Sequence, residues 1–273
     1  MCIIRQQMKK VILIILLTFI LFALYVLVQK VHKYYFPIKP MVAYQTAHND
    51  DDTIRIAYIG DSWAYMHQHQ EPCLIPQIIE SQTNYPTKVY SYGLGGRTSK
   101  EIYEALFADK HLRTMMCEHG ADYCFISAGI NDVNKKLSIR YYQNSMDNII
   151  RFMLKNHIHP VILEIPDYDV NKAYRVLKNS SKLLRMLSMT INAVPMDCKQ
   201  IYRNALDTLI KEKGYQEKVS VVRYKLWNND YHHDQKRLYL KDGFHLNDYG
   251  YTVLDSIIAM EILKNIEDYE NRN

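Results

Sequence analysis

A serine stands at the point where an apolar stretch of the chain ends. Gly60-Asp61-Ser62 follows the apolar run 54–59, so Ser62 is expected at the end of a strand. Asp242 and His245 lie three residues apart, close enough for the carboxylate to fix the tautomer of the imidazole. A hydroxyl, a base and an acid that orients the base are the groups that acyl transfer through a serine requires.

Two further segments could stabilise the oxyanion that forms during acyl transfer. Gly96 closes a glycine-rich turn at 93–96, and Asn131 lies in the tetrapeptide 129–132. The backbone N–H groups of Ser62 and Gly96 and the side-chain amide of Asn131 are suitable neutral donors. Each segment alone also has an ordinary structural interpretation as a turn or a helix cap. The chemical interpretation therefore depends on whether the fold brings the segments together.

The segments between these residues alternate between strand and helix patterns. Strands are expected at 54–60, 88–92, 122–127, 160–165 and 219–224, and helices at 72–81, 98–116, from 138 onward and 247–263. Thr98 and Glu101 form a capping-box pattern, and Ser138 can cap the following helix. The stretch 167–214 is expected to be helical with a polar insert. This alternation predicts an α/β fold, a three-layer α/β/α sandwich around a parallel sheet. Ser62, Gly96 and Asn131 would then meet at the carboxyl edge, where open parallel sheets bind ligands.

Together the four segments resemble the SGNH (GDSL-like) hydrolase superfamily over residues 54–263. The matching blocks are Gly60-Asp61-Ser62, Gly93-Leu94-Gly95-Gly96-Arg97-Thr98-Ser99, Gly129-Ile130-Asn131-Asp132 and Asp242-Gly243-Phe244-His245. Trp63 departs from the Leu of the family name, and Ser91 stands where the second block often has Asn. The resemblance implies a flavodoxin-like sandwich with Ser62 as nucleophile, His245 as base and Asp242 as its orienting acid. It also implies an oxyanion hole of Ser62, Gly96 and Asn131, and no cofactor.

An uncharged apolar run near the N-terminus predicts a membrane span. Residues 11–28 contain no charge, and a helix of this length nearly crosses a hydrocarbon core of about 30 Å. We expect a cytoplasmic tail at 1–10, an uncleaved signal anchor at 11–29, a linker at 30–53 and a catalytic domain at 54–267. A cleaved signal peptide and a buried helix are the alternatives. The short charged tail favours the cytoplasm, which would place the catalytic domain on the extracytoplasmic side.

The composition argues against several other classes of protein. The 34 basic and 29 acidic residues give a net charge of +5 without a dense Lys/Arg block, so nucleic-acid binding is not expected. The histidine pairs 67/69 and 232/233 lack further ligands at metal-site spacing, so no metal is expected. Five cysteines form no zinc or disulfide pattern.

These features favour a serine esterase that hydrolyses acyl esters, with O-acetyl groups on cell-surface glycans or lipid-linked sugars as the expected substrates. The first alternative is an O-acyltransferase that uses the same three residues and a sugar hydroxyl as acceptor. The second alternative is a catalytically inactive glycan-binding or assembly protein. The sequence gives no prediction of the oligomeric state.

Overall fold

Five parallel strands form the centre of the fold in a computed structural model that describes residues 2–35, 38 and 40–270. The strands are β1 (Ile54–Gly60), β2 (Thr87–Gly93), β3 (Tyr123–Ser127), β4 (His159–Leu163) and β5 (Ser220–Val222). Their order is β2-β1-β3-β4-β5, and every neighbouring pair is parallel. The parallel sheet and the five strands expected from the sequence are thus confirmed, with shifts of at most two residues at the strand ends.

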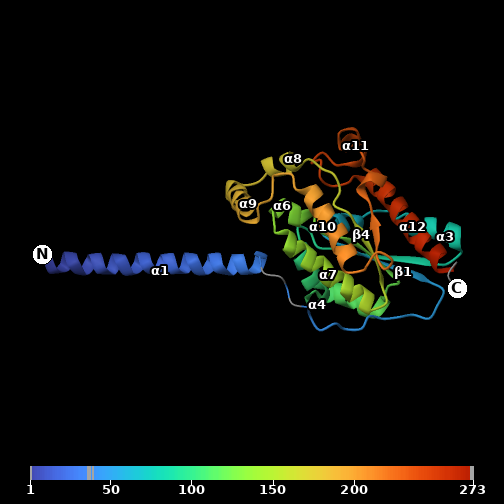
Figure 1. Cartoon of the computed structure of the whole chain (residues 1–273), viewed down its shortest axis with the longest axis horizontal. Coiled ribbons are helices and arrows are strands. Elements are labelled where there is room, and N and C mark those ends of the chain that lie inside the picture. The colour runs from blue at the N-terminus through green and yellow to red at the C-terminus, as the bar shows by residue number, and fades with distance from the viewer. Residues whose placement is uncertain (1, 36–37, 39, 271–273) are drawn as a thin grey trace. The chain divides into compact units, whose positions relative to one another are not determined.

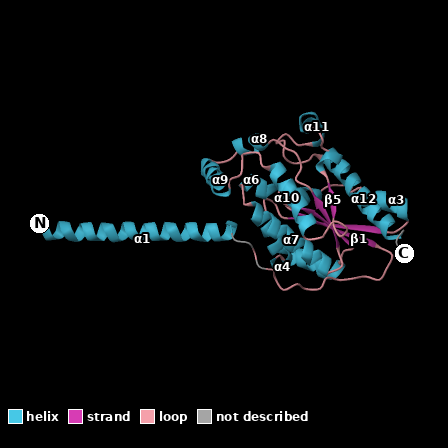
Figure 2. Cartoon of the chain, viewed as in Figure 1, coloured by secondary structure: helices cyan, strands magenta, loops and turns pink. Residues whose placement is uncertain are grey.

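Two layers of helices cover the faces of this sheet (Figures 1 and 2). The first layer contains α3 (Ile75–Thr83) and α12 (Asp248–Glu270), and the second contains α4 (Ser99–Ala108), α7 (Ile139–Lys155) and α10 (Lys199–Glu212). The remaining elements are α2 (Ser62–His67), α5 (Lys110–Thr114), η1 (Met115–His119), α6 (Ile130–Lys135), α8 (Val170–Arg175), α9 (Asn179–Asn192), η2 (Tyr224–Leu226) and α11 (Tyr231–Leu238). The expected three-layer sandwich is therefore confirmed.

Local sequence explains why these elements begin where they do. Because β1 is covered by helices on both faces, four consecutive residues from Ile56 to Ile59 are buried, as is typical of parallel strands. At the start of α4 the side chain of Thr98 accepts a hydrogen bond from the backbone N–H of Glu101. The Glu101 carboxylate in turn accepts one from the backbone N–H of Thr98. Ser138 caps α7 in the expected way, through a bond from the N–H of Tyr141.

The N-terminal residues form a unit of their own, separate from the unit at 38–273. This unit is the helix α1 (Cys2–Tyr35), in which Gln7–Leu27 has a mean hydropathy of 2.8. Its length and composition match those of a membrane-spanning helix or a signal sequence. Within the second unit, the segment 40–53 contains no helix or strand. It lies on the domain through bonds such as those from Met41 N to Tyr103 Oη and from Thr46 N to Asn156 Oδ1.

The register of the sheet aligns the ends of three strands. Gly60 pairs with Gly93 of β2 on one side and with Ser127 of β3 on the other. The residues that follow these three positions are Asp61, Leu94 and Ala128, which begin the loops carrying the sequence motifs. Parallel pairing thus brings the three loops to one edge of the sheet.

Candidate active site

A continuous chain of hydrogen bonds joins the three residues expected to carry the chemistry. His245 Nε2 lies 2.9 Å from Ser62 Oγ, and His245 Nδ1 lies 2.7 Å from Asp242 Oδ2. Ser62 and His245 are 183 residues apart in sequence and meet at the carboxyl edge of the sheet. This arrangement allows the imidazole to accept the serine proton while the carboxylate stabilises the imidazolium that results.

Several bonds hold the carboxylate of Asp242 in place. Its Oδ1 accepts from the backbone N–H groups of Phe244 at 2.9 Å and His245 at 3.0 Å. Partial burial alone would raise the pKa of Asp242, but the bonds from His245 and Phe244 outweigh burial and hold that pKa below its ordinary value. Asp242 therefore remains ionised and acts only as an acceptor towards the imidazole.

The loop that carries His245 is itself anchored by a glycine and a tyrosine. Gly243 has a φ of +67°, a left-handed conformation that favours glycine, and a Cβ there would lie 2.7 Å from Tyr231 Oη. The Tyr231 hydroxyl donates to the Gly243 carbonyl at 2.6 Å. A short antiparallel bridge between Tyr239 and Leu246 closes the loop. These contacts fix the position of the imidazole relative to Ser62.

Ser62 begins α2 directly after the tight turn that ends β1. Gly60 adopts a φ of +157°, and a Cβ at this position would lie 2.2 Å from the Ser127 carbonyl oxygen, so the turn requires glycine. The Asp61 side chain caps α2 by accepting from Trp63 N at 3.0 Å. As the first residue of α2, Ser62 has a backbone N–H without an acceptor within its helix. That N–H is available to a ligand beside the hydroxyl.

Asp61 is fully buried beneath the site. Its Oδ1 also accepts from Ser127 Oγ at 3.3 Å, and its Oδ2 accepts from the side-chain amide of Asn131 at 3.3 Å. Burial raises the pKa of Asp61 to about 7, although the bonds from Trp63 and Ser127 oppose this shift. The same Asn131 amide donates to the Arg97 carbonyl at 3.0 Å. Asn131 thus faces the Ser62 turn on one side and the Gly96 loop on the other.

Gly96 lies in an exposed turn with a φ of +73°. A Cβ would meet no atom within 4 Å there, so glycine serves the backbone conformation of this turn. Lys135 Nζ donates to the Gly96 carbonyl at 3.1 Å, which leaves the opposite side of that residue for its N–H. No hydrogen-bond acceptor for this N–H occurs among residues 2–35, 38 and 40–270. The geometry is compatible with donation to a ligand.

Asp132 braces the loops that carry Gly96 and Asn131. Both of its carboxylate oxygens bind Ser99, one through the backbone N–H at 2.8 Å and the other through the hydroxyl at 2.5 Å. Burial raises the pKa of Asp132 to about 6, while the Ser99 bonds counteract this effect. The last residue of the 129–132 block is therefore a buried link between α6 and the start of α4.

Trp63 packs inside the domain. It is fully buried and makes edge-to-face contacts with Trp227 at 5.9 Å and Tyr239 at 6.3 Å between ring centroids. Its carbonyl accepts from Tyr251 Oη at 3.0 Å. The large side chain thus packs the nucleophile turn against the residues that follow η2 and α11, which accounts for an aromatic residue at this position.

A second buried network joins the end of α2 to β2 and α12, and the sequence did not predict it. His67 donates or accepts at both ring nitrogens, with Ser91 Oγ at 3.0 Å and Asp255 Oδ1 at 2.8 Å. The second Asp255 oxygen accepts from Leu74 N at 2.9 Å. Ser91 thus supplies a hydrogen bond although it replaces the more usual Asn. No local signal could have found this network, because His67 and Asp255 are 188 residues apart.

His67, Cys73 and Asp255 are also the residues of the described chain with metal-ligand atoms closest together, all within 4.8 Å of one another. Their donor atoms already engage each other, however, since His67 Nε2 is hydrogen-bonded to Asp255 and lies 3.9 Å from Cys73 Sγ. Burial, reinforced by the neighbouring Asp255, raises the pKa of the Cys73 thiol to about 12, which disfavours the thiolate that metals bind. The cluster is therefore a hydrogen-bonded brace between α2 and α12.

Known proteins share the fold of this chain. A solved structure of a lipase/acylhydrolase from Enterococcus faecalis has a similar fold, with 14% identity and a TM-score of 0.51, and the match covers 77% of this chain and 95% of that chain. The structure of the acetyl xylan esterase AlAXEase is also similar, with 15% identity and a TM-score of 0.52, and the match covers 75% of this chain and 98% of that chain. No curated protein sequence matches the chain significantly. The sequence model of the GDSL-like Lipase/Acylhydrolase family matches residues 58–253, a range that contains Ser62, Asn131 and His245. The chain belongs to this GDSL-like (SGNH-type) hydrolase family.

Proposed function

We propose that the protein is a membrane-anchored serine esterase in which Ser62 is the nucleophile, His245 the general base and Asp242 the acid that orients it. The observation that carries this proposal is the unbroken hydrogen-bond chain from Asp242 through His245 to Ser62, with distances of 2.7 and 2.9 Å. Family membership supports acyl-ester hydrolysis as the reaction class.

The reaction follows from the positions of these groups. Ser62 Oγ attacks the ester carbonyl carbon while its proton passes to His245 Nε2. The resulting oxyanion accepts hydrogen bonds from the N–H groups of Ser62 and Gly96 and from the Asn131 amide. His245 then gives its proton to the leaving alkoxide, and the acyl group remains on Ser62. Water attacks this acyl-enzyme, transfers its proton to His245 and releases the carboxylic acid, after which the proton returns to Ser62.

Asn131 must exchange one partner to act in this way. In the structure its two amide hydrogens point to the Arg97 carbonyl at 3.0 Å and to Asp61 at 3.3 Å. The longer contact with Asp61 is the one that a substrate oxygen replaces. Replacement is easiest while Asp61 is protonated, because a neutral carboxyl is a weaker acceptor than a carboxylate.

We infer that the substrates are O-acetyl esters on cell-surface glycans or lipid-linked sugars. The triad is open to solvent, with the His245 side chain 24% and the Asp242 side chain 47% exposed, which suits an ester at the surface of a large molecule. A membrane anchor at α1 would keep the enzyme beside such substrates. A structural relative named as an acetyl xylan esterase is consistent with a small acyl group on a sugar.

The decisive test compares Ser62→Ala and His245→Ala with the wild-type chain on an activated acetate ester. Both variants should lose at least about a thousandfold in kcat while their circular dichroism and melting temperature stay unchanged. Ser81→Ala, which removes an exposed serine on α3, is the matched control and should keep full activity. Labelling of wild type but not Ser62→Ala by a fluorophosphonate probe would identify the nucleophile. Full activity in both variants would overturn the assignment.

Hydrolysis and transfer differ only in the acceptor of the acyl group. Incubation of the protein with O-acetylated glycans should release free acetate, with no net gain of acetyl on an added glycan acceptor. A gain of acetyl on the acceptor would instead identify a transferase. The absence of both acetate release and probe labelling would identify a binding protein.

A further inference from the structure

The helix α9 presents its apolar side chains to solvent. Leu183, Leu184, Met186, Leu187 and Ile191 are each 50–64% exposed. None of the 14 residues of α9, all of which the structure describes, is buried. Residues spaced by three, four and eight positions lie on one helical face, so these side chains form a continuous apolar face. A surface helix of a soluble domain normally turns its apolar face to the core and its polar face to solvent. A large apolar face exposed to solvent therefore indicates a binding surface.

The opposite face of α9 is polar and turns towards the domain. Lys182, Arg185 and Asn192 are half-buried on that side. The Asn192 amide donates to the carbonyl of Lys136, at the end of α6, at 2.7 Å. Because its polar face is attached to the body of the domain, α9 cannot bury its leucines there without losing these contacts.

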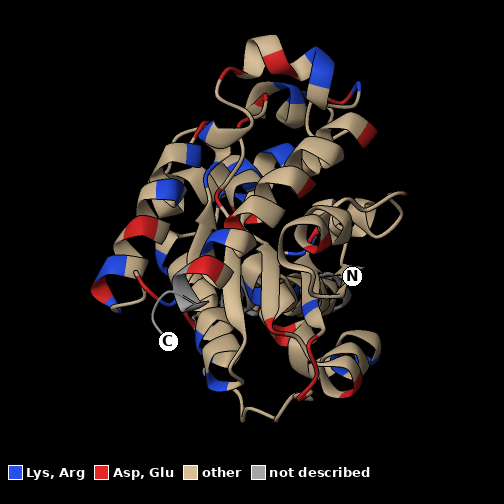
Figure 3. Cartoon of the chain, turned by 90° about the vertical axis from the view of Figure 1, so that its right-hand side faces the viewer, with Lys and Arg blue, Asp and Glu red and all other residues tan. Residues whose placement is uncertain are grey.

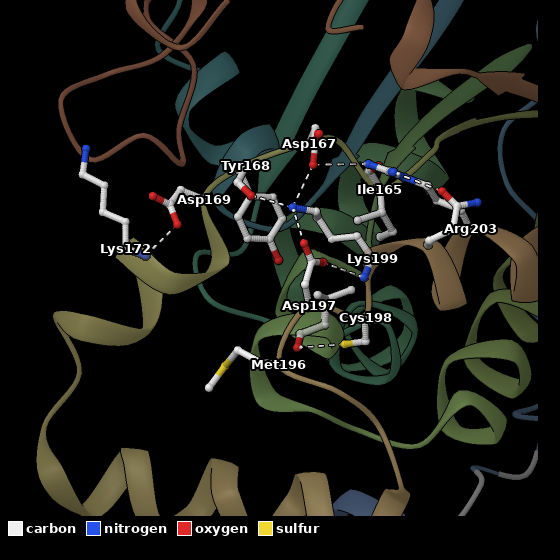
Figure 4. Close-up of polar contacts among 12 residues, drawn as sticks. Ile165, Asp167, Tyr168, Asp169, Lys172, Met196, Asp197, Cys198, Lys199 and Arg203 are labelled. Carbon is white, nitrogen blue, oxygen red and sulfur yellow. Dashed lines mark hydrogen bonds and ion pairs between the residues drawn. The ribbon is translucent and has the colours of Figure 1, made fainter. Parts of the chain in front are cut away.

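The insert that contains α8 and α9 is fixed at its base (Figure 4). Lys199 Nζ contacts Asp167 Oδ1 at 2.7 Å and Asp197 Oδ2 at 3.2 Å, and it donates to the Tyr168 carbonyl at 2.6 Å. One buried lysine thus joins the two ends of the insert. Arg203 Nε adds a bond to the Ile165 carbonyl at 2.8 Å. The outward orientation of α9 therefore rests on a well-connected base.

The middle of the same insert, between the aspartates at its two ends, carries only basic charges. Residues 170–194 contain Lys172, Arg175, Lys178, Lys182 and Arg185 and no acidic residue, so this segment carries a charge of +5, the net charge of the whole chain. The other face of the domain, seen from the side of α3 and α12 in Figure 3, has basic and acidic residues interspersed. An apolar face with exposed basic side chains beside it, here Arg175 and Lys178, is typical of helices that lie in the interface of an anionic membrane.

We propose that α9 docks on an anionic lipid surface, with Leu183, Leu187 and Ile191 inserted at the level of the headgroups. This inference rests on the membrane anchoring in the proposed function, because α1 would hold the domain beside the bilayer and make even a weak interfacial contact effective. Arg175 at the end of α8 and Lys178 just before α9 are both exposed, so they can bind lipid phosphates.

The insert also connects α9 to the candidate active site. Lys172 Nζ donates to the carbonyl of Lys241, next to Asp242, at 2.6 Å. The Tyr168 ring makes an edge-to-face contact with Phe244, next to His245, with 4.9 Å between centroids. Docking through α9 would therefore hold the site close to the lipid surface, which favours lipid-linked acyl esters among the proposed substrates.

The test uses the full-length chain reconstituted in vesicles and the variant Leu187→Trp. Trp63 and Trp227 are buried, so the difference from wild type reports the new side chain. The vesicles contain equal amounts of phosphatidylglycerol and phosphatidylcholine. We expect the emission of the tryptophan at position 187 to be at least about twofold lower when the lipid chains are brominated than when they are not. Met260→Trp, at a residue of α12 that is 53% exposed, is the matched control and should keep its emission.

The electrostatic part of the proposal is tested by adding Arg175→Gln and Lys178→Gln to Leu187→Trp. Loss of these two charges should lower the docking equilibrium by roughly tenfold and restore most of the emission. Lys211→Gln with Lys264→Gln, both at exposed lysines, should leave the quenching unchanged. The proposal would be overturned if brominated lipid quenched the tryptophans on α9 and α12 to the same extent. It would also be overturned if the tryptophan on α9 were quenched as strongly in pure phosphatidylcholine as in the anionic mixture. A blue-shifted emission that persists in detergent and disappears on dilution would overturn it in favour of a second copy of the chain.

Docking and catalysis can fail independently in this design. Quenching needs no turnover, so Leu187→Trp combined with Ser62→Ala should be quenched as strongly as Leu187→Trp alone. Quenching without esterase activity would contradict only the proposed reaction. Esterase activity without quenching would contradict only the docking of α9.

Discussion

At the scale of single residues, the candidate site depends on two aspartates with opposite electrostatic surroundings. Asp242 is partly exposed and its pKa is lowered by hydrogen bonds from Phe244 and His245. Asp61 is buried beneath Ser62 and its pKa is raised to about 7. One carboxyl is thus held ionised beside the base, while the other is largely neutral near pH 6. The two positions respond differently to substitution.

We expect Asp242→Asn to lower kcat for an activated acetate ester by about 10²- to 10⁴-fold with little change in KM, because the amide can no longer fix the tautomer of His245 or stabilise its charged form. Steady-state kinetics on the soluble ester would measure both constants. Asp248→Asn, at a nearby exposed acid, should behave as wild type. An unchanged kcat in Asp242→Asn would show that the carboxylate has no part in the reaction.

Asp61 should make stability depend on pH. Its pKa is about 7 in the folded protein against an ordinary value of 3.8, so the folded state binds the proton more tightly. Its contribution is fully present below about pH 4 and is lost as the pH rises through 7. Between these limits the free energy of unfolding of wild type should fall by roughly 3 to 4 kcal/mol relative to Asp61→Asn. Urea denaturation of both proteins from pH 4 to 8 would measure this difference; parallel profiles would contradict it.

At the scale of elements, α2 is held by contacts near both of its ends, at Trp63 and at His67. The Trp63 ring packs against Trp227 and Tyr239, and its carbonyl accepts a hydrogen bond from α12. His67 binds Asp255 of α12 and Ser91 of β2. The nucleophile turn is thus fixed by contacts that are remote in sequence from Ser62.

We expect Asp255→Ala to lower the free energy of unfolding by about 3 kcal/mol, because it leaves His67 and the N–H of Leu74 buried without their acceptor. Glu267→Ala, at an exposed residue near the end of the same helix, should change it by less than about 0.5 kcal/mol. Urea denaturation at pH 7 would compare the three proteins. If Asp255→Ala lowered the free energy of unfolding no more than Glu267→Ala does, the hydrogen bonds of Asp255 would not contribute to stability.

The sequence predicts the elements well where the physical signal is local. Apolar runs mark all five strands, and the side chains of Thr98 and Ser138 mark the starts of α4 and α7. The helix expected at 72–81 instead runs over Ile75–Thr83, because the chain bends at 71–72 and stays irregular up to residue 74. The stretch 167–214 is helical as expected, but its insert exposes apolar side chains where a polar surface was expected. Helical spacing predicts α9 without indicating which face points inward.

The residues of the candidate site also differ in whether the sequence predicts them. Ser62, Gly96, Asn131, Asp242 and His245 lie in short motifs that can be read from neighbouring residues, and the structure brings the triad together. The burial of Asp61 and the brace at His67 depend on residues far apart in the chain. Such contacts are set by tertiary packing, to which composition and spacing give no guide.

At the scale of the whole molecule, the proposed topology places the domain on the extracytoplasmic side of a membrane. We expect a reporter enzyme that is active only after export to be active when fused to the C-terminus of the full chain. A fusion whose segment 1–29 is deleted should be equally abundant and inactive, which provides the control. An inactive but well-expressed full-length fusion would show that the orientation is wrong.

The single lysine that joins both ends of the insert has a consequence for the evolution of the protein. Since Asp167 and Asp197 meet at Lys199, the chain between them leaves the domain and returns at nearly the same place. Changes in length or sequence between these two ends, at α9, therefore need not move β4 or α10. The surface of the insert can vary while the sheet that positions Ser62 keeps its geometry.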